Sequence, residues 1–283
     1  MTSTDDRRLR FAVIGHPVAH SRSPAMHGAA YRALDLPHVY EKIDTTADDL
    51  PHRIAELRHH DLDGLNVTVP HKQAVMALVD EIARSAQAIG AANTVVRTPS
   101  GRLVAHNTDA PALAEEIATL HGGALEGGSA IVIGSGGAAR AAIFALASLG
   151  LERIHVRSRR PIADAAAIAG SRTVVAEALG APPLERSDLV AIVQCTTAGM
   201  HAGAPGHVSV DAVHWPSVPA SCVAYDVVYS PETTPFLEAA ATHGLAHANG
   251  LGMLVAQGAL AFQLWLGVAP PRDVMRAALS DAK

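Results

Sequence analysis

The chain has few of the residues that mark several common classes of protein. Only two of its 283 residues are cysteine, Cys195 and Cys222, too few for a disulfide framework or a thiolate metal site. No uninterrupted apolar run approaches the roughly 20 residues that span a bilayer. The first residues pass from polar to strand-like without the apolar core of a secretory signal. These absences predict a protein of the reducing cytoplasm that has no membrane partner.

Strong charge and clustered metal ligands are missing as well. Lys and Arg number 22 against 27 Asp and Glu, and the net charge of −5 provides no overall basic field for nucleic acid. The 16 histidines are scattered, and the zinc motif H-E-x-x-H is absent. We therefore expect no metal and no nucleic acid among the ligands.

The composition predicts a globular α/β protein with two domains. Apolar residues make up 49% of the chain and charged residues 17%, which excludes a disordered chain. The length exceeds the roughly 250 residues at which single cores tend to split. Strands are expected over residues 10–15, 39–45, 65–69, 94–97, 103–106, 130–133, 153–157, 189–195 and 223–228. Helices are expected from Ser23 and from His71, and over 48–60, 111–120, 138–149, 253–266 and 272–280. Strands that alternate with helices in this way favour parallel sheets.

A glycine-rich turn follows the expected strand 130–133 and precedes a helix. It contains Gly134, Ser135, Gly136, Gly137, Ala138 and Ala139, in a G-x-G-x-x-A pattern. The first glycine permits a tight turn, and the second lets backbone N–H groups approach a pyrophosphate at the helix N-terminus. We predict dinucleotide binding here. A purely structural turn is the alternative.

The end of the next strand distinguishes between the two nicotinamide dinucleotides. An NAD site needs an acidic residue about 20 residues after the glycine turn, to hold the ribose 2′-hydroxyl. Here the strand ends in Arg157, Ser158, Arg159 and Arg160, with no acid before Asp164. Guanidinium groups suit a 2′-phosphate, so the sequence favours NADP over NAD. A solvated basic turn is the other interpretation.

Polar residues in the first half are candidates for the chemistry. Lys72 follows the strand 65–69 and falls in the first turn of the helix expected from His71. The positive end of the helix dipole disfavours an ammonium there, so this lysine becomes a better proton carrier near neutral pH. Asp109 precedes another helix and is a candidate partner, since a Lys–Asp pair can deprotonate a secondary alcohol while hydride leaves its carbon. A surface lysine and a simple helix cap are the alternatives.

Two hydroxyls precede the helix that begins at Ser23. Ser21 and Ser23 lie where a helix N-terminus favours an anion, which predicts a site for a carboxylate. A plain helix cap at Ser23 is compatible with that role.

Ordered motifs recur from the first strand to the last helix. In chain order they are GHPVAHSRSP from Gly15, GLNVTVPHK from Gly64, GAANT from Gly90, NTD from Asn107, Tyr225-Asp226 with Tyr229 and Pro231, and GLGMLVAQG from Gly250. Together they resemble the shikimate dehydrogenase family. The resemblance implies a substrate-binding domain (residues 1–108 and 250–283) and a Rossmann NADP-binding domain (residues 109–249).

The resemblance also implies an activity and a set of site residues. The reaction of the family is the reversible reduction of 3-dehydroshikimate to shikimate with NADPH, in aromatic amino acid biosynthesis. By similarity, Lys72 and Asp109 carry the proton transfer. The implied substrate ligands are Ser21, Ser23, Asn66, Thr68, Asn93, Tyr229 and Gln257. The implied cofactor ligands are Gly134 to Ala138, Ser158, Arg159, Arg160, Val227 and Gly250.

Some positions depart from the family pattern, and two other functions stay open. Ser158 stands for the usual asparagine of the cofactor clamp, and Gln194 replaces the asparagine before the Thr196-Thr197 loop. Gly28 replaces a common asparagine of the first motif. A quinate/shikimate dehydrogenase with relaxed substrate or cofactor choice is one alternative, and a non-catalytic NADP-binding protein is another. The expected assembly is a monomer or homodimer.

Overall fold

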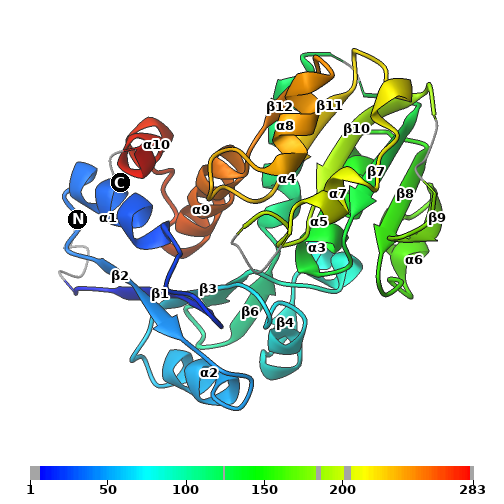
Figure 1. Cartoon of the computed structure of the whole chain (residues 1–283). Coiled ribbons are helices and arrows are strands. Elements are labelled where there is room, and N and C mark those ends of the chain that lie inside the picture. The colour runs from blue at the N-terminus through cyan, green and yellow to red at the C-terminus, as the bar shows by residue number, and fades with distance from the viewer. Residues whose placement is uncertain (1–6, 124, 183–185, 201–204, 281–283) are drawn as a thin grey trace. The chain divides into compact units, whose positions relative to one another are not determined.

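The computed structural model describes residues 7–123, 125–182, 186–200 and 205–280 (Figure 1). Contacts within the chain divide it into two compact units. The first contains the described residues up to Thr108 together with those from Leu254 onward, and the second is Asp109–Met253. No helix in these described ranges is long and apolar enough to cross a membrane. The assignment of the units to substrate and cofactor, and the domain boundaries expected from the sequence, stay predictions.

A six-stranded mixed sheet forms the centre of the first unit (Figure 1). Its strands are β1 (Arg10–Gly15), β2 (Val39–Asp44), β3 (Gly64–Val67), β4 (Glu81–Ile82), β5 (Thr94–Arg97) and β6 (Leu103–His106). They lie in the order β2-β1-β3-β5-β6-β4. The first three strands are parallel to one another, whereas β5 and β6 form an antiparallel hairpin.

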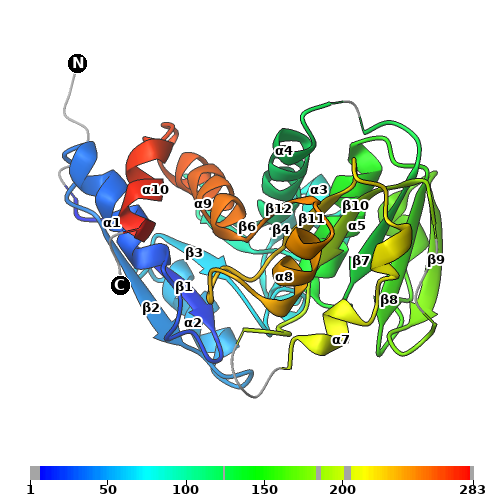
Figure 2. The same cartoon turned by 45° about the horizontal axis from the view of Figure 1, so that its top comes forward.

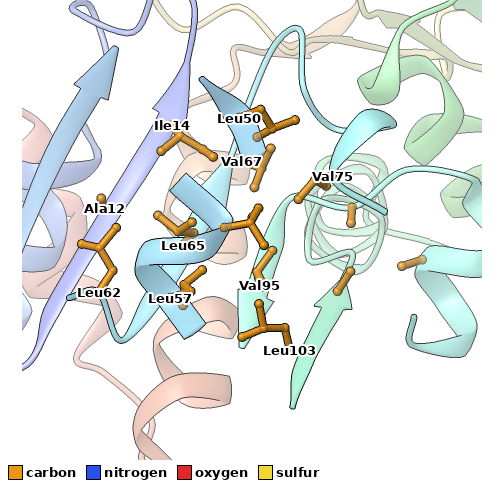
Figure 3. Close-up of a cluster of buried hydrophobic side chains, with 14 residues drawn as sticks. Ala12, Ile14, Leu50, Leu57, Leu62, Leu65, Val67, Val75, Val95 and Leu103 are labelled. Atoms are coloured by element: carbon orange, nitrogen blue, oxygen red, sulfur yellow. The ribbon is translucent and has the colours of Figure 1, made fainter. Parts of the chain in front are cut away.

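One face of this sheet is covered by α2 (Leu50–Arg58). Leu50, Ile54 and Leu57 recur at helical spacing and pack on alternate residues of β1 and β3, including Ile14 and Leu65 (Figure 3). Because strand side chains alternate between faces, the intervening residues of β3 point to the other side, where the site residue Asn66 lies.

The other face packs against α9 (Leu251–Leu266), a helix that begins in the second unit and continues in the first. The indole of Trp265 stacks on Phe11 of β1 with ring centroids 4.8 Å apart. It also covers Gly64, where a Cβ atom would lie 2.4 Å from the indole nitrogen. The helices α1 (Ser23–Ala33) and α10 (Arg272–Ser280) pack against each other and complete this unit with α3 (Arg84–Ile89).

The prediction of a helix from His71 is wrong. The chain forms a turn, a short 3-10 helix (η1, Ala74–Leu78), the strand β4 and then α3. The backbone is diverted because Asp80 N donates to Leu103 O while Leu103 N donates to the Asp80 carboxylate. The apolar residues that suggested a helix still reach the core under α2, so their spacing was compatible with both structures.

The second unit contains a six-stranded sheet that is parallel throughout. Its strands are β7 (Ser129–Ile133), β8 (Arg153–Ser158), β9 (Thr173–Ala178), β10 (Leu189–Gln194), β11 (Val223–Asp226) and β12 (Ala246–Ala248). The order β12-β11-β10-β7-β8-β9 is that of a dinucleotide-binding Rossmann sheet. The chain reverses its direction of travel across the sheet between β7 and β10, and ligands of such sheets bind at that point.

Helices cover both faces of this sheet (Figure 2). On one face α8 (Pro235–Thr242), α7 (His207–Val210) and η2 (Trp215–Ser217) enclose a core that includes Phe236, Trp215 and Ile133. On the other, α4 (Asp109–His121), α5 (Gly137–Ser148) and α6 (Ala165–Ala169) pack in sequence. The elements expected from the sequence are confirmed within two residues at either end, except the helix from His71. The strands β4, β9 and β12 and the helices α6 to α8 were not expected.

Candidate active site

The two serines lie side by side where α1 begins. The Ser21 hydroxyl donates to that of Ser23 at 3.2 Å, and Ser23 N lies 3.3 Å from Ser21 Oγ. Ser23 is the first helical residue, and the residue at the cap position, Arg22, makes no side-chain capping bond. Ser23 is therefore not the helix cap that the sequence allowed. Both hydroxyls are at the positive end of the helix, where a carboxylate is favoured.

Lys72 lies in the turn that follows β3, and the surrounding backbone holds this turn in place. His71 N donates to Thr68 O at 2.9 Å, and the buried His71 ring contacts Thr45 O through Nε2 at 2.6 Å. Ala92 N donates to Lys72 O at 2.7 Å. No α-helix begins at Lys72, so the helix-dipole argument for this lysine is wrong. The turn itself gives Lys72 a defined backbone position.

A buried network of polar side chains lies next to that turn. Asn93 Oδ1 accepts from Thr108 N at 2.7 Å, and Asn93 Nδ2 donates to Thr108 Oγ1 at 2.9 Å and to Gln257 Oε1 at 3.4 Å. Asn66 Nδ2 donates to Asn93 O at 3.2 Å and to Thr94 Oγ1 at 3.0 Å. The structure thus brings together three predicted substrate ligands, from β3, from the residue before β5 and from α9.

Tyr40, which was not among the predicted site residues, connects this network to the serines. Its hydroxyl donates to Asn66 Oδ1 at 2.7 Å and also forms a side-chain hydrogen bond with Ser23. Burial raises the pKa of Tyr40 well above its ordinary value, so it stays a neutral donor. Little in the sequence pointed to Tyr40, although the structure shows that it is the one buried side chain of β2.

Thr108 belongs to the NTD motif but was not a predicted site residue. It forms hydrogen bonds with Asn93 and directly precedes Asp109 in the chain. Asp109 is the first residue of α4 and is buried. A carboxylate in the first turn of a helix is electrostatically favoured. The hydrogen bond from Thr108 N to Asn93 therefore fixes the backbone directly before this candidate partner of Lys72.

The glycine-rich turn of the second unit can accept a phosphate. Gly134 has φ +128°, a conformation that favours glycine, and its N–H donates to Arg157 O at 2.8 Å. Gly136 occupies the cap position of α5 without a side-chain capping bond, and a Cβ there would meet nothing within 4 Å. Ser135, Gly137 and Ala138 complete the turn and are partly exposed. The free space and the helix N-terminus fit a pyrophosphate.

The basic end of β8 divides into a buried and an exposed part. Arg157 is buried, and its Nε donates to Glu177 at 2.8 Å while its other nitrogens donate to carbonyls that include Ala212 O at 3.0 Å. Arg157 is therefore structural and not part of the basic surface that the sequence suggested. Arg159 and Arg160 are exposed, and within the described chain neither side chain has a hydrogen bond or ion pair. The Ser158 hydroxyl donates to Arg160 O at 2.6 Å.

The remaining predicted residues follow β11 or precede α9. Val227 and Gly250 are neighbours: a Cβ on Gly250 would lie 2.2 Å from Val227 O, and Gly250 N donates to Val228 O at 3.1 Å. Tyr229 is half-buried in the loop after β11. Among the residues that the structure describes, no group of His, Cys, Asp and Glu could hold a metal ion.

Comparison with known proteins finds similarity to one family at both ends of the chain. Residues 13–95 match the model of the shikimate dehydrogenase substrate binding domain, and residues 250–279 match that of the shikimate 5'-dehydrogenase C-terminal domain. The shikimate dehydrogenase (NADP(+)) of Symbiobacterium thermophilum is 40% identical over 274 residues, which cover 94% of this chain and 92% of that protein.

Solved structures match over almost the full length. The shikimate 5-dehydrogenase of Thermus thermophilus in complex with NADP(H) and shikimate has 40% identity and a TM-score of 0.82, covering 97% of this chain and 100% of that one. The quinate dehydrogenase of Corynebacterium glutamicum in complex with NAD has 30% identity and a TM-score of 0.85, covering 96% and 99%. The family of this chain follows from these matches together with its motifs: it belongs to the shikimate dehydrogenases.

Proposed function

We propose that this chain is an NADP-dependent shikimate dehydrogenase, which reversibly reduces 3-dehydroshikimate to shikimate in aromatic amino acid biosynthesis. The observation that carries the proposal is the buried network around Asn93. This network holds Gln257 and the backbone before Asp109, and the adjacent Ala92 N–H holds the Lys72 carbonyl. A site for a polyhydroxylated ring needs several fixed donors and acceptors of this kind.

In this proposal Ser21 and Ser23 bind the carboxylate of the substrate, with Tyr229 as a further donor. Thr68, Asn93 and Gln257 bind the ring hydroxyls. Both N–H bonds of the Asn66 amide are already engaged within the protein. Asn66 therefore contributes by orienting Asn93 and Thr94.

Reduction of the ketone requires a proton at the oxygen and a hydride at the carbon. Lys72 donates that proton, and in the reverse direction takes it from the secondary alcohol. Asp109 is the proposed partner of Lys72 and accepts a hydrogen bond from a neighbouring hydroxyl of the substrate. General acid–base transfer of this type contributes about 10²–10⁴-fold to rate.

The second unit has the features that bind NADP. Gly134 to Ala138 present backbone N–H groups to the pyrophosphate, and Val227 and Gly250 line the nicotinamide. Arg159 and Arg160 bind the 2′-phosphate, since both are exposed. Ser158 adds little there as a donor, because its hydroxyl is committed to Arg160 O. When bound, NADP(H) would supply or accept the hydride.

The deciding experiment is an absorbance assay of nicotinamide reduction with shikimate and quinate, each with NADP+ and with NAD+. We expect the highest kcat/KM for shikimate with NADP+. A higher value for quinate would establish the quinate-dehydrogenase alternative, which the similarity to the Corynebacterium glutamicum enzyme keeps relevant. Tight NADPH binding without turnover of either acid would identify a non-catalytic binding protein.

The role of Lys72 gives a separate prediction. Lys72→Ala is expected to lower kcat for shikimate oxidation by about 10²–10⁴, because proton transfer loses its carrier. The dissociation constant of NADPH, measured by fluorescence titration, should change little. Undiminished turnover in this variant would remove Lys72 from the mechanism.

A further inference from the structure

Two buried polar side chains end neighbouring strands of the second sheet. Gln194 is the last residue of β10 and Asp226 the last of β11, and the two are paired in register. On its other side Gln194 is paired with Ile133, the residue before Gly134. Both side chains are fully buried. They therefore lie at the carboxyl ends of the strands beside the switch point of the sheet, where such sheets bind their ligands.

Gln194 holds the loop that follows β10. Its Oε1 accepts from Thr196 N, and its Nε2 donates to Thr196 O at 3.2 Å and Ala198 O at 3.3 Å. The same Nε2 contacts Asp226 Oδ1 at 3.3 Å. A single amide thus links residues 196–198 to the end of the adjacent strand.

Asp226 holds the loop that follows β11, at both of its ends. Its Oδ1 accepts from Val228 N at 2.9 Å, and its Oδ2 accepts from Thr234 Oγ1 at 2.6 Å. Thr234 in turn caps α8 by accepting from Leu237 N. Tyr229 lies in the loop between these attachments, and Val227 lies between Asp226 and the first of them.

The loop held by Gln194 also contacts the glycine-rich turn. A Cβ on Gly134 would lie 3.2 Å from the carbonyl carbon and oxygen of Cys195 and from Thr196 Cγ2. Cys195 N donates to Ile133 O at 2.8 Å. Movement of residues 195–198 would therefore displace the backbone that receives the pyrophosphate.

We propose that Gln194 and Asp226 are positioning residues, which act together through these two loops to set the place of the nicotinamide and of Tyr229. Neither side chain needs to touch the ligands. The proposal rests on the function proposed above and assigns a role to Gln194, which replaces the usual asparagine of the family. Its extra methylene lets one amide hold the loop after β10 while reaching Asp226.

The burial of Asp226 is unfavourable for stability, which supports a functional reason for this residue. Among the described residues its donors are Gln194, Thr234 and the Val228 N–H, all uncharged. Burial raises the pKa of Asp226 to about 6 in spite of these hydrogen bonds. A buried carboxylate without a cationic partner is costly, and such groups concentrate at functional sites.

The test uses Gln194→Asn and Asp226→Asn in the full-length chain. The side chain of asparagine at position 194 is too short to keep all the hydrogen bonds of Gln194. Asparagine at position 226 has the same size as aspartate but replaces one carboxylate oxygen, an acceptor, with an NH2 group, a donor. We expect either change to raise the dissociation constant of NADPH and the KM for NADP+, and to lower kcat, by about 10- to 100-fold, as misplacement of a reacting group does. The melting temperature of Asp226→Asn should not fall.

Asp188→Asn is the matched control, because Asp188 pairs with Arg186 at the opposite end of β10. It should lower the melting temperature and leave NADPH binding at the wild-type value. The proposal is overturned if both test variants bind NADPH and turn over like the wild type, or if their losses only parallel lower melting temperatures. NADPH binding can be measured even if shikimate is not a substrate. Failure of the proposed function can therefore be distinguished from failure of this inference.

Discussion

His27 is fully buried in the first unit. Its ring stacks on Tyr40 with centroids 4.2 Å apart, and within the described residues neither ring nitrogen has a hydrogen-bond partner. Burial lowers the pKa of His27 to about 3. The residue is therefore neutral in the folded protein, whereas in the unfolded chain His27 has its ordinary pKa of 6.5.

This difference predicts a loss of stability in mild acid. Between pH 6.5 and about 3 the unfolded chain binds a proton at His27 that the folded chain excludes, so the free energy of unfolding falls as pH decreases. The slope from this residue approaches about 1.4 kcal/mol per pH unit. Urea unfolding from pH 7.5 to 4.5 measures it, with His27→Phe as the variant that keeps the stack and lacks the titration.

Asp226 has the opposite effect of pH on the stability of the second unit, in which it lies. Its pKa is raised from 3.8 to about 6, so the folded state binds the proton more tightly and gains stability as pH falls through that interval. In Asp226→Asn the stability of the second unit should therefore rise less than in the wild type as pH falls through that interval. An unchanged slope in His27→Phe would contradict the assignment to His27.

At the scale of elements, α9 depends on close approach to the first sheet. Trp265 lies flat on Gly64 and donates from Nε1 to Val95 O at 3.1 Å. Farther along the helix, a Cβ on Gly258 would lie 2.3 Å from Met26 Cε of α1. Because Gln257 is adjacent to Gly258, the same packing sets the helix rotation that directs Gln257 to Asn93.

Two glycine substitutions should have opposite effects. Gly64→Ala places a methyl group inside the Trp265 ring contact and is expected to cost about 1–3 kcal/mol of unfolding free energy. Gly28→Ala, on α1 with only Arg32 Nη1 at 3.4 Å, should stabilise by about 0.5–1 kcal/mol through helix propensity. Chemical denaturation of both variants checks this, and a stable Gly64→Ala protein would refute the packing argument.

At the scale of the whole molecule, each unit has a hydrophobic core of its own. One lies between α2 and the first sheet, and the other between α8 and the second. Separate cores predict two thermal transitions, each stabilised by its own ligand. NADP+ at 100 times its dissociation constant should add about 2.7 kcal/mol to one of them.

Differential scanning calorimetry measures these transitions. We expect NADP+ to shift the transition of the unit that contains Gly134, and shikimate alone to shift the other. Gly134→Ala should abolish the NADP+ shift, because an alanine at φ +128° is strained and its methyl meets the Cys195 backbone. A single transition shifted equally by either ligand would contradict independent units.

The features that could be predicted from the sequence are those with a local physical cause. The turn at Gly134 follows from glycine conformation between a strand and a helix, and the preference for NADP follows from arginines without an acid at the end of β8. The hairpin of β5 and β6 follows from its Pro- and Gly-containing turn. In each case the cause spans only a few residues.

Contacts between distant segments were decided by the tertiary structure alone. Tyr40 reaches Asn66 across 26 positions and Asn93 reaches Gln257 across 164, so packing alone brings these groups together. Tertiary contacts likewise bury Arg157, and they give the backbone after Lys72 a turn and a short 3-10 helix where an α-helix was expected. Sequence determines which polar groups are available. The burial of each group, and the need to satisfy its hydrogen bonds away from water, decide which partner it takes.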